Sequence, residues 1–404
     1  MTSDYTSILK ISWRVFRQTP VRLLWKFVKN FGWRSFRNFQ KYEKRLKKGD
    51  PFFPAFNMIS VTETCNLACS GCWVSQGGRK ALSTEQLDNI IDCSKKVGSY
   101  FFGILGGEPL MYKGLFDVME KHKDCYFLLF TNGTLLTDEI AQRMRKLGNI
   151  AVLISIEGLK EESDRRRGRD EVYERTLRGL RACRKAGLIF GAAASICKSN
   201  YDELVSHKYL ELVAKEGAAY LWYYIYRPVG AVANPANALS KEQIRSFREF
   251  LVEERRNAPV IIIDTYWDEE GRAMCPGATG MSHHISPSGA VEFCPPLQMA
   301  KDFLNEQGTN LVELCNQSQF LADLRKMTAE TSRGCILLED PQKLVRFLAD
   351  QHATDTTSRG TVMQEYEKMG VQPGHDMGED AIPEKNPIYR MLKKRYFFGF
   401  GAYG

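Results

Sequence analysis

Stretches rich in β-forming residues alternate with helical patterns from about residue 57 onward, and this alternation is the feature that most restricts the fold. The expected strands lie at 57–63, 101–107, 126–133, 151–158, 189–197 and 220–230. Strands separated by single helices predict βαβ units and a parallel sheet, and hence an α/β protein. Six such units fit an open, partial (β/α)6 TIM-like barrel better than a complete eight-unit barrel. A doubly wound sheet is the alternative that periodicity leaves open.

The length of 404 residues exceeds one average domain and fits a single α/β barrel with appendages. No run of 18 apolar residues exists, so no segment is expected to span a bilayer. We expect five regions: a basic, aromatic N-terminal segment (1–56), the partial barrel (57–232), a connecting helix and strand (233–274), a small cysteine-containing domain (275–345) and a C-terminal tail (346–404).

Cysteines are frequent, with eleven in the chain, and no secretory signal is visible. In a reducing compartment, grouped cysteines are typical of metal or cluster ligands and not of a disulfide framework. The strongest group is Cys65, Cys69 and Cys72, which are spaced by three and two residues directly after the first expected strand. A loop there lies at the C-terminal rim of a barrel, where such folds build their active sites.

Three thiolates can hold three of the four irons of a [4Fe–4S] cluster and leave one iron for a small molecule. A structural zinc normally has four protein ligands, so a zinc knuckle with a distant fourth ligand is the alternative. The motif Cys65-x3-Cys69-x2-Cys72 resembles the signature of radical S-adenosylmethionine (radical SAM) enzymes. The resemblance implies that the open iron binds S-adenosylmethionine (SAM) and that the reduced cluster cleaves it to a 5′-deoxyadenosyl radical.

Further motifs at the expected strand ends resemble the same family over residues 57–230. The run 106–109 is similar to a glycine-rich family motif in which glycines admit the ligand, and Glu108 is expected to accept a hydrogen bond from its ammonium group. The run 164–168 resembles an Arg-Gly stretch of the peptide-modifying branch. The resemblance implies these cofactor-binding residues: Gly106, Gly107, Glu108, Pro109, Asn132, Ser155, Glu157 and Arg167.

A second cysteine group lies toward the C-terminus, where Cys275-x13-Gly289-x4-Cys294 resembles the opening of the auxiliary-cluster domains known as SPASM and twitch. Gly289 is expected in a hairpin turn that brings the two cysteines together. Cys335 falls where those domains supply a further ligand, and the absence of cysteine from 336–341 favours the shorter, twitch-like form. The resemblance implies an auxiliary [4Fe–4S] cluster on these three cysteines, with Cys315, another residue or the substrate as its fourth ligand.

One acidic residue, Asp264, ends an apolar strand expected at 260–265. It is expected to point at the active cavity as a catalytic acid or base, and a turn-forming role is the alternative. His283 and His284 lie between the auxiliary cysteines, where a structural hydrogen-bonding role and a functional one both remain open.

The first 50 residues hold thirteen Lys or Arg, three acids and ten aromatic residues, so this segment carries a charge of +10 and the rest of the chain −2. Basic and aromatic residues alternate over 7–39, and Pro20 is expected to divide this stretch into two helices. Basic residues on one face and Trp or Phe on the other are typical of a helix lying in a membrane interface. A helix that docks on the barrel with its basic face in water is the alternative, and no nucleic-acid-binding module is recognisable.

Together these features predict an enzyme that modifies an unactivated carbon by SAM-derived radical chemistry. The expected substrate is lipophilic or membrane-associated, because residues 1–56 do not resemble the leader-peptide domain that many peptide-modifying relatives carry. A peptide maturase is the alternative enzyme, and an iron–sulfur electron carrier or sensor is the alternative outside catalysis. The expected partners are a reductant such as ferredoxin or flavodoxin and an anionic membrane surface, without nucleic acid. The expected location is the cytoplasm, peripheral on the inner face of the membrane.

Overall fold

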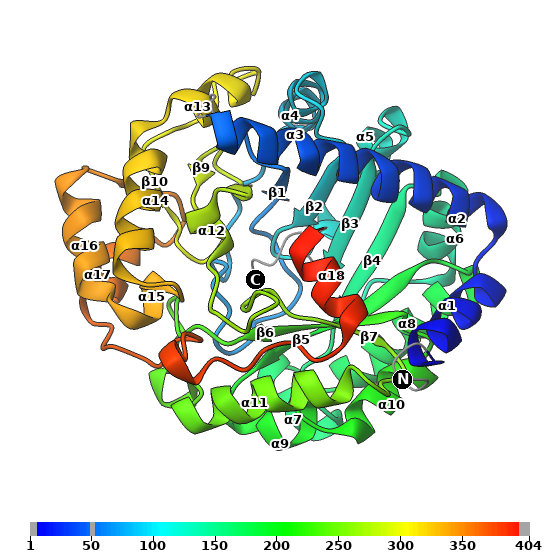
Figure 1. Cartoon of the computed structure of the whole chain (residues 1–404). Coiled ribbons are helices and arrows are strands. Elements are labelled where there is room, and N and C mark those ends of the chain that lie inside the picture. The colour runs from blue at the N-terminus through cyan, green and yellow to red at the C-terminus, as the bar shows by residue number, and fades with distance from the viewer. Residues whose placement is uncertain (1–5, 49–52, 396–404) are drawn as a thin grey trace.

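Seven parallel strands form most of a nine-stranded sheet in the computed structural model, which describes residues 6–48 and 53–395 (Figure 1). The strands lie side by side in chain order: β1 (Phe56–Ser60), β2 (Phe101–Leu105), β3 (Tyr126–Thr131), β4 (Ile150–Ser155), β5 (Phe190–Ile196), β6 (Tyr220–Ile225) and β7 (Ile261–Ile263). Each neighbouring pair in this series is parallel. The predicted α/β partial barrel is confirmed, and β7 adds a parallel strand from the segment expected to be a connection.

Helices connect these strands and cover the outer side of the sheet (Figure 1). Local signals explain several of their ends. Ser83 and Ser240 begin two of the helices with capping boxes, and Gly148 ends another with a φ of 73°. The helices are α4 (Thr84–Lys96), α5 (Leu115–Lys121), α6 (Asp138–Leu147), α7 (Lys160–Arg167), α8 (Val172–Ala186), α9 (Tyr201–Leu204), α10 (His207–Lys215) and α11 (Lys241–Glu254).

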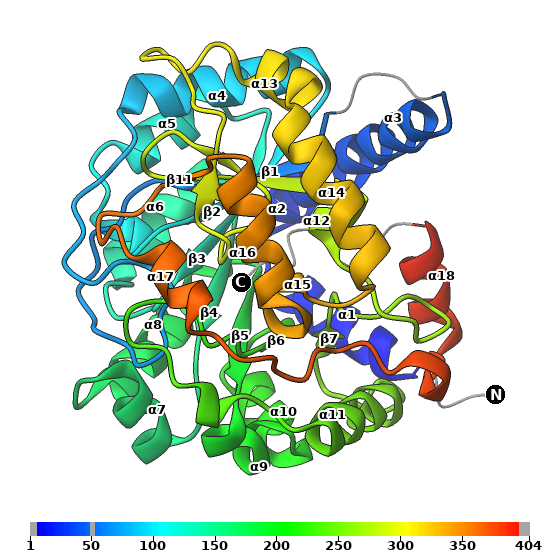
Figure 2. The ribbon, with the colours of Figure 1, turned by 90° about the vertical axis from the view of Figure 1, so that its left-hand side faces the viewer.

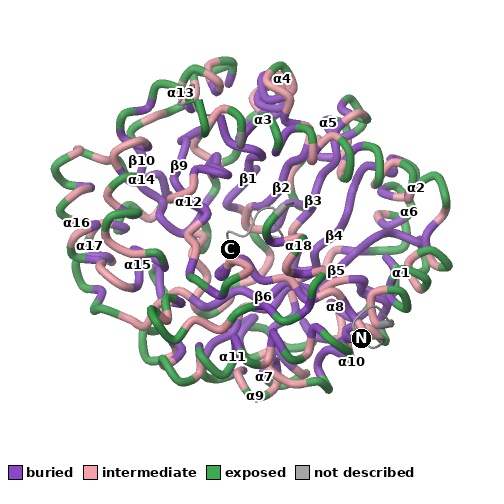
Figure 3. The backbone as a smooth tube through the Cα atoms, viewed as in Figure 1, coloured by how far each residue is buried: buried purple, intermediate pink, exposed green. Residues whose placement is uncertain are grey.

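The strands are buried on both faces, as Figure 3 shows for the purple centre of the molecule. Alternate residues of a strand point to opposite faces, so two separate cores form. Phe127 and Leu221 belong to the core between the sheet and the outer helices, whereas Leu128 and Trp222 belong to the core on the inner side. The inner side is where the barrel holds its cavities.

The C-terminal third extends the barrel sheet at its other edge. Strand β8 (Ser282–Ile285) pairs in parallel with β1, and β9 (Val291–Glu292) pairs antiparallel with β8. Gly289 turns the β8–β9 connection with a φ of 77°, as expected for a hairpin glycine. Figure 2 shows the remaining helices stacked over this edge: α12 (Pro276–Thr279), α13 (Leu311–Gln317), α14 (Gln319–Thr331), α15 (Ile336–Glu339), α16 (Pro341–Asp350) and α17 (Val362–Glu367). A two-stranded ladder of β10 (Met299–Ala300) and β11 (Thr354–Asp355) joins them.

Helices from both ends of the chain lie along the inner side of the sheet (Figure 1). The N-terminal ones are α1 (Thr6–Gln18), α2 (Val21–Lys26), a π-helix (Phe27–Trp33) and α3 (Arg34–Lys48), and Pro20 separates the first two as expected. The C-terminal one is α18 (Pro387–Arg395). Within the described ranges, 6–48 and 53–395, every helix is too short or too polar to cross a membrane.

Candidate active site

A cavity of about 220 Å³ lies inside the barrel at the C-terminal ends of the parallel strands. Residues from the ends of β2, β3, β4, β5 and β6 line it together with the loop after β1. The structure brings most of the expected site residues to this cavity. They are Cys65, Cys69, Cys72, Gly106, Gly107, Asn132, Ser155, Glu157 and Arg167.

The loop that carries the three cysteines is held in place by close backbone contacts. Gly107 donates its amide hydrogen to the carbonyl of Thr62 over 2.7 Å, and a Cβ at this position would come within 2.5 Å of the Thr64 carbonyl oxygen. Gly168 approaches from the end of α7, with a φ of 68°, and a Cβ there would meet the carbonyl oxygen of Ala68 at 2.5 Å. Glycine is therefore required at both places by the packing of neighbouring loops against the cysteine loop.

Glu108 does not line the cavity, although its motif predicts a hydrogen bond to the ligand. Its carboxylate is fully buried and accepts hydrogen bonds from the amide of Leu110, the hydroxyl of Thr131 and the amide of Asn132, at 2.8 to 3.0 Å. Burial raises the pKa of Glu108 above its ordinary value. Neither Glu108 nor Pro109 is among the residues that line the cavity, so Glu108 ties the loops after β2 and β3 together.

Arg167 and Glu157 form a buried ion pair beside the cysteines. The Arg167 guanidinium donates to Glu157 Oε1 over 3.0 Å and to the thiol of Cys69 over 3.7 Å. Burial alone would lower the pKa of Arg167, but Glu157 and the thiol of Cys69 raise it above its ordinary value. A permanent positive charge therefore lies next to the cysteine loop, where it favours thiolate and other anionic groups.

Asn132 connects the end of β3 to the same loop. Its side-chain amide donates to Asn66 Oδ1 over 2.9 Å and lies 3.9 Å from the thiol of Cys65. The Asn132 carbonyl in turn accepts from the hydroxyl of Thr176 over 3.0 Å, which anchors it to α8. Asn132 is thus held by both the cysteine loop and α8, next to a candidate cluster ligand.

Several cavity residues were not predicted from the sequence. Ser195 donates its amide hydrogen to Glu157 Oε2 over 3.1 Å, and Arg166 lies over the ring of Tyr226 at 5.7 Å. Tyr224 and Arg227 line the cavity from the end of β6. Their only common signal in the sequence is position at a strand end, which is too general to select them before the barrel is assembled.

The second cysteine group also gathers in space. Cys275 precedes α12, Cys294 follows β9 and Cys335 precedes α15. Burial raises the pKa of Cys275 to about 11, and the neighbouring Cys335 adds to this effect. Cys294 lies within electrostatic reach of both other thiols, and its pKa is raised first by burial and then by Cys275. The structure therefore brings three cysteines from separate segments into one buried group.

Arg227 joins the two cysteine groups. It lines the cavity at the end of β6, and its Nε donates to the thiol of Cys335 over 3.2 Å. Burial would lower the pKa of Arg227, yet Cys335 and the ring of Tyr266 raise it. Arg227 thus places a positive charge between the first cavity and the second group of thiols.

The spacing of the thiols indicates what they can hold. A zinc ion has Zn–S distances near 2.3 Å, which bring its ligand atoms to within roughly 4 Å of one another. Among the described residues, the groups of three whose ligand atoms approach within 4.8 Å are centred on His122, and neither cysteine triplet belongs to them. The fit to a [4Fe–4S] cluster therefore depends on the number and type of the ligands, since three thiolates can bind three of its irons.

Two other residues considered in the sequence have structural partners, although the ring of His284 also packs edge-on against Trp73, which lines the active-site cavity. Cys315 is buried in α13, where its electrostatic neighbours are Arg325 and Asp302. His284 lies between the hydroxyl of Ser60, at 2.7 Å, and Glu292, at 2.5 Å, and so joins β1, β8 and β9. Cys315 is therefore a packed residue of α13, and His284 forms hydrogen bonds between neighbouring strands.

Asp264 is not brought to the cavity. It is fully buried at the end of β7, where it pairs with Arg255 and with Lys393 of α18, the latter at 3.1 Å. Burial would raise its pKa, but Lys393 and Arg255 together hold the pKa of Asp264 well below its usual range. The expectation that Asp264 points at the active cavity does not agree with this geometry, because two cations draw the carboxylate between β7, α11 and α18.

The profile of the Radical SAM superfamily matches residues 59–206, from β1 to α9, and this segment contains the first cysteine group and the end of each strand from β1 to β5. Residues 59–206 belong to the radical SAM superfamily. The enzymes of this superfamily use a [4Fe–4S] cluster and SAM, and the three thiols beside a glycine-lined cavity fit these two groups. Cys65, Cys69 and Cys72 are the residues that would hold the radical SAM cluster.

Curated relatives of this radical SAM chain act in different processes. Fe-coproporphyrin III synthase of Methanosarcina barkeri is 28% identical over 222 residues, which cover 52% of this chain and 55% of that protein. Mycofactocin maturase MftC of Mycolicibacterium smegmatis is 28% identical over 254 residues, which cover 58% of this chain and 62% of that protein. The chain therefore spans little more than half the length of these two relatives.

Solved structures share the architecture. Streptococcus suis SuiB, crystallised with its precursor peptide SuiA, superposes with a TM-score of 0.59 at 18% identity. The superposition covers 72% of this chain and 71% of SuiB. At this level of identity the likeness shows that the radical SAM chain has the same fold, and it extends beyond residues 59–206 of the family match.

Proposed function

We propose that the protein cleaves SAM reductively and abstracts a hydrogen atom from an unactivated carbon of a lipophilic or membrane-associated substrate. The observation that supports the reaction best is the meeting of three thiols, a glycine-lined cavity and the Arg167–Glu157 pair at the strand ends. When bound, the reduced cluster supplies the electron that releases the 5′-deoxyadenosyl radical from SAM. A reductant such as ferredoxin or flavodoxin delivers that electron.

The chain's own residues divide the remaining tasks. Cys65, Cys69 and Cys72 hold the cluster at the rim of the cavity, and the glycines at 106 and 107 leave room for SAM beside it. Arg167 keeps a positive charge beside Cys69, which balances part of the negative charge of a thiolate-bound cluster.

We infer that Cys275, Cys294 and Cys335 hold a second, auxiliary [4Fe–4S] cluster. Support comes from the electrostatic proximity of the three thiols, of which Cys294 and Cys335 are buried, and from Arg227, which lies between Cys335 and the first cavity. An electron released when the substrate radical is oxidised can reach an acceptor placed on this side of the cavity. The fourth position is open to the substrate or to a residue other than Cys315, which lies elsewhere.

A lipophilic substrate is favoured by the surface of the N-terminal helices. Trp13, Trp25 and Trp33 are 60% to 65% exposed. The first 50 residues, which include them, hold thirteen Lys or Arg and only three acids. Exposed tryptophan among Lys and Arg is typical of a protein surface that lies on an anionic membrane. The protein would then act in the cytoplasm, peripheral on the inner face of the membrane.

A peptide maturase is the second candidate, because MftC is a maturase and SuiB was crystallised with a precursor peptide. Deuterium transfer separates the two candidates. Cells grown in deuterated medium provide an organic-solvent extract and a peptide fraction, and each is incubated with the reduced holoenzyme. Deuterium should enter 5′-deoxyadenosine from the organic extract, whereas transfer from the peptide fraction alone would establish the maturase.

The proposed reaction is tested by changing Cys65, Cys69 and Cys72 to Ala together. After anaerobic reconstitution and reduction, the triple variant should form no 5′-deoxyadenosine above background, because no thiolate remains to hold the cluster. Iron should persist at the second cysteine group. Cys93→Ala is the matched control, since Cys93 lies in α4 away from the cavity and should leave cleavage unchanged. Full cleavage by the triple variant would contradict the assignment.

A further inference from the structure

A second cavity of about 830 Å³ lies inside the barrel, at the end opposite the cysteine loop. Its walls come from the N-terminal ends of β2 to β7, from the N-terminal helices, and from Leu392 of α18. The side chains that line it are aliphatic or aromatic with few exceptions, and none of those described carries a charge. A charged ligand would lose its hydration there without compensation, so the cavity suits a neutral, mostly apolar molecule.

The two cavities are stacked along the same strands. On β3, Leu128 lines the apolar cavity and Phe130 lines the active-site cavity. On β6, Trp222 lines the apolar cavity and Tyr224 lines the active-site cavity. Residues two apart on a strand face the same side and are separated by about 7 Å, so one short step leads from the apolar cavity to the active site.

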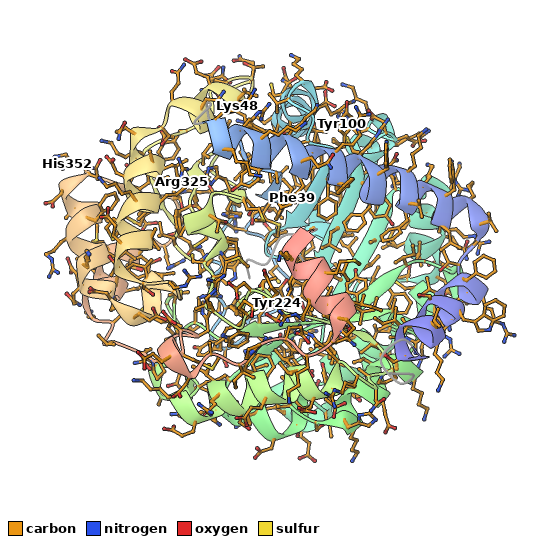
Figure 4. All side chains as sticks on the ribbon, viewed as in Figure 1. Phe39, Lys48, Tyr100, Tyr224, Arg325 and His352 are labelled. Carbon is orange, nitrogen blue, oxygen red and sulfur yellow. The ribbon has the colours of Figure 1, made fainter. Side chains whose placement is uncertain are left out.

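The boundary between the cavities carries polar atoms without a partner. The rings of Trp222 and Tyr224 are stacked with centroids 5.6 Å apart, and both residues are more than nine-tenths buried. Within the described part of the chain, Trp222 Nε1 and Tyr224 Oη have no hydrogen-bond partner, and neither has Ser35 Oγ on the wall of the apolar cavity. Phe39 of α3, which lines the apolar cavity, belongs to the same inner core as Tyr224, and Figure 4 labels both residues near the centre of the molecule.

Such groups are rarely left unsatisfied inside a protein, because each costs free energy when it is buried without a partner. Burial also raises the pKa of Tyr224 well above its ordinary value, so its hydroxyl keeps its proton and remains a donor. Trp222 Nε1 and Tyr224 Oη are thus two unpartnered donors at the boundary between the cavities, and they fit an oxygen atom of a neutral ligand.

The apolar cavity reaches the surface between the N-terminal helices. Phe16, Val21, Trp25 and Val28 line the cavity and yet are 55% to 71% exposed. An exposed apolar rim of this kind costs free energy in water unless something apolar covers it.

The charges of these helices explain why that rim faces outward. Arg14 donates to the carbonyl of Ala218 over 2.7 Å, Arg22 to that of Arg145 over 2.5 Å, and Lys26 to that of Leu147 over 2.6 Å. Arg145 and Leu147 are in the last turn of α6, where carbonyl groups and the helix dipole attract cations. Three basic side chains thus dock the helices on the barrel, and the apolar side chains between them are turned to the surface.

We propose that the apolar cavity binds a neutral lipid from an anionic bilayer, with an oxygen-bearing head beside Trp222 and Tyr224 and a hydrocarbon chain that leaves between α1 and α2. Lys10, Arg17, Lys29 and Arg37 are exposed around the rim, and no acidic residue occurs between 6 and 42, so the charge complements an anionic membrane. The proposed site names the substrate class of the proposed function. Its role as a substrate site therefore rests on that function. The binding itself does not depend on that reaction.

The binding experiment uses the holoenzyme without SAM and radiolabelled hexadecanol as probe. Hexadecanol should bind once per chain, and palmitate, which has the same chain length but a charged head, should bind at least ten-fold more weakly. Equal affinity for both probes, or no binding of hexadecanol, would overturn the proposal. Because SAM cleavage is measured separately, loss of cleavage with retained binding would refute only the proposed function.

Conservative variants locate the bound head. Tyr224→Phe, which removes only the hydroxyl, and Trp222→Phe, which replaces the indole by a smaller aromatic ring without a donor, should each weaken hexadecanol binding about five-fold. Tyr112→Phe is the matched control, because the Tyr112 hydroxyl bonds to the carbonyl of Leu82 outside both cavities. Ala151→Phe, which adds bulk inside the apolar cavity, should abolish binding. Unchanged affinity in Ala151→Phe with intact iron content would overturn the location.

Two further measurements test whether the C-terminal segment occupies the apolar cavity and whether the bilayer is the source of the lipid. Residues 396–404 follow α18 and include four aromatic residues in their first five positions. If hexadecanol binds only after this segment is deleted, the chain's own end occupies the cavity and the proposal is wrong.

The wild-type chain should sediment with vesicles of phosphatidylglycerol at low salt. The double variant Trp13→Ser, Trp25→Ser should reduce the bound fraction several-fold. No sedimentation of the wild type would remove the bilayer as the source.

Discussion

At the scale of single residues, the site depends on a few buried charges whose partners come from different loops. Glu157, at the end of β4, holds Arg167 at 3.0 Å and the amide of Ser195 at 3.1 Å. Arg167 then reaches Cys69. A carboxylate is needed here because it is the counter-ion of a buried guanidinium, and it also fixes the direction in which that guanidinium points.

Glu157→Gln should therefore lower the free energy of unfolding by about 3 kcal/mol, because it leaves the charge of Arg167 buried without its counter-ion. It should also weaken SAM binding roughly ten-fold, as Arg167 is no longer held beside the cysteine loop. Chemical denaturation and anaerobic titration calorimetry check the two effects. Glu161→Gln, an exposed position of α7, is the control and should change neither quantity. Normal SAM affinity in a destabilised Glu157→Gln protein would limit Glu157 to a structural role.

At the scale of elements, a buried ion cluster attaches α18 to the barrel. Asp264 at the end of β7 pairs with Arg255 of α11 and Lys393 of α18, and Glu384 pairs with Arg255 at 2.5 Å. Burial lowers the pKa of Lys393 to about 8, although Asp264 opposes the shift. These charges bind the C-terminal helix, whose Leu392 completes the wall of the apolar cavity.

Asp264→Asn should destabilise the fold by about 3 to 5 kcal/mol, since two buried cations lose their main partner. Formation of 5′-deoxyadenosine per folded molecule should stay within two-fold of the wild type. Thermal or chemical denaturation, together with the cleavage assay, checks both. Asp117→Asn removes an exposed pair with Arg143 and should change stability by less than about 0.5 kcal/mol. A stable Asp264→Asn protein that has lost turnover would restore Asp264 as an acid or base.

At the scale of the whole molecule, one sheet organises two cysteine groups and two cavities. The first cysteine group follows β1, and the second is built around β8 and β9, which extend the sheet from the other side of β1. The active-site cavity lies at the C-terminal ends of the strands and the apolar cavity at their N-terminal ends. A ligand in the apolar cavity therefore approaches the active site along the inner face of the barrel.

Two [4Fe–4S] clusters imply about eight irons per chain after anaerobic reconstitution. Cys275→Ala should reduce the iron content by about half, because it removes a ligand of the second cluster only. Iron analysis of the wild type and this variant measures the effect, and Cys183→Ala, a buried cysteine of α8, serves as control. About four irons in the wild type would exclude the auxiliary cluster, and about twelve would require a third.

The local patterns of the sequence were sufficient for the barrel strands, the cysteine motif and most of the cavity residues. The alternation of strands and helices determines a parallel sheet, and a parallel sheet places the ends of all strands at one rim. The resemblance to the radical SAM family then assigned Cys65, Asn132 and Glu157 to one site at this rim before any contact was known. Their chemistry depends on residue type and on position at a strand end, and both are visible in the sequence.

Only the tertiary structure decided where side chains point when several partners compete. Asp264 follows a strand as the site residues do, but two buried cations, from α11 and α18, hold its carboxylate away from the active-site cavity. Glu108 belongs to the expected motif, but its carboxylate is used by the loop after β3. The apolar cavity is assembled from six strands and both ends of the chain, so no local pattern could reveal it. Long-range packing and the pairing of buried charges join residues that are far apart in the sequence, so local periodicity does not predict them.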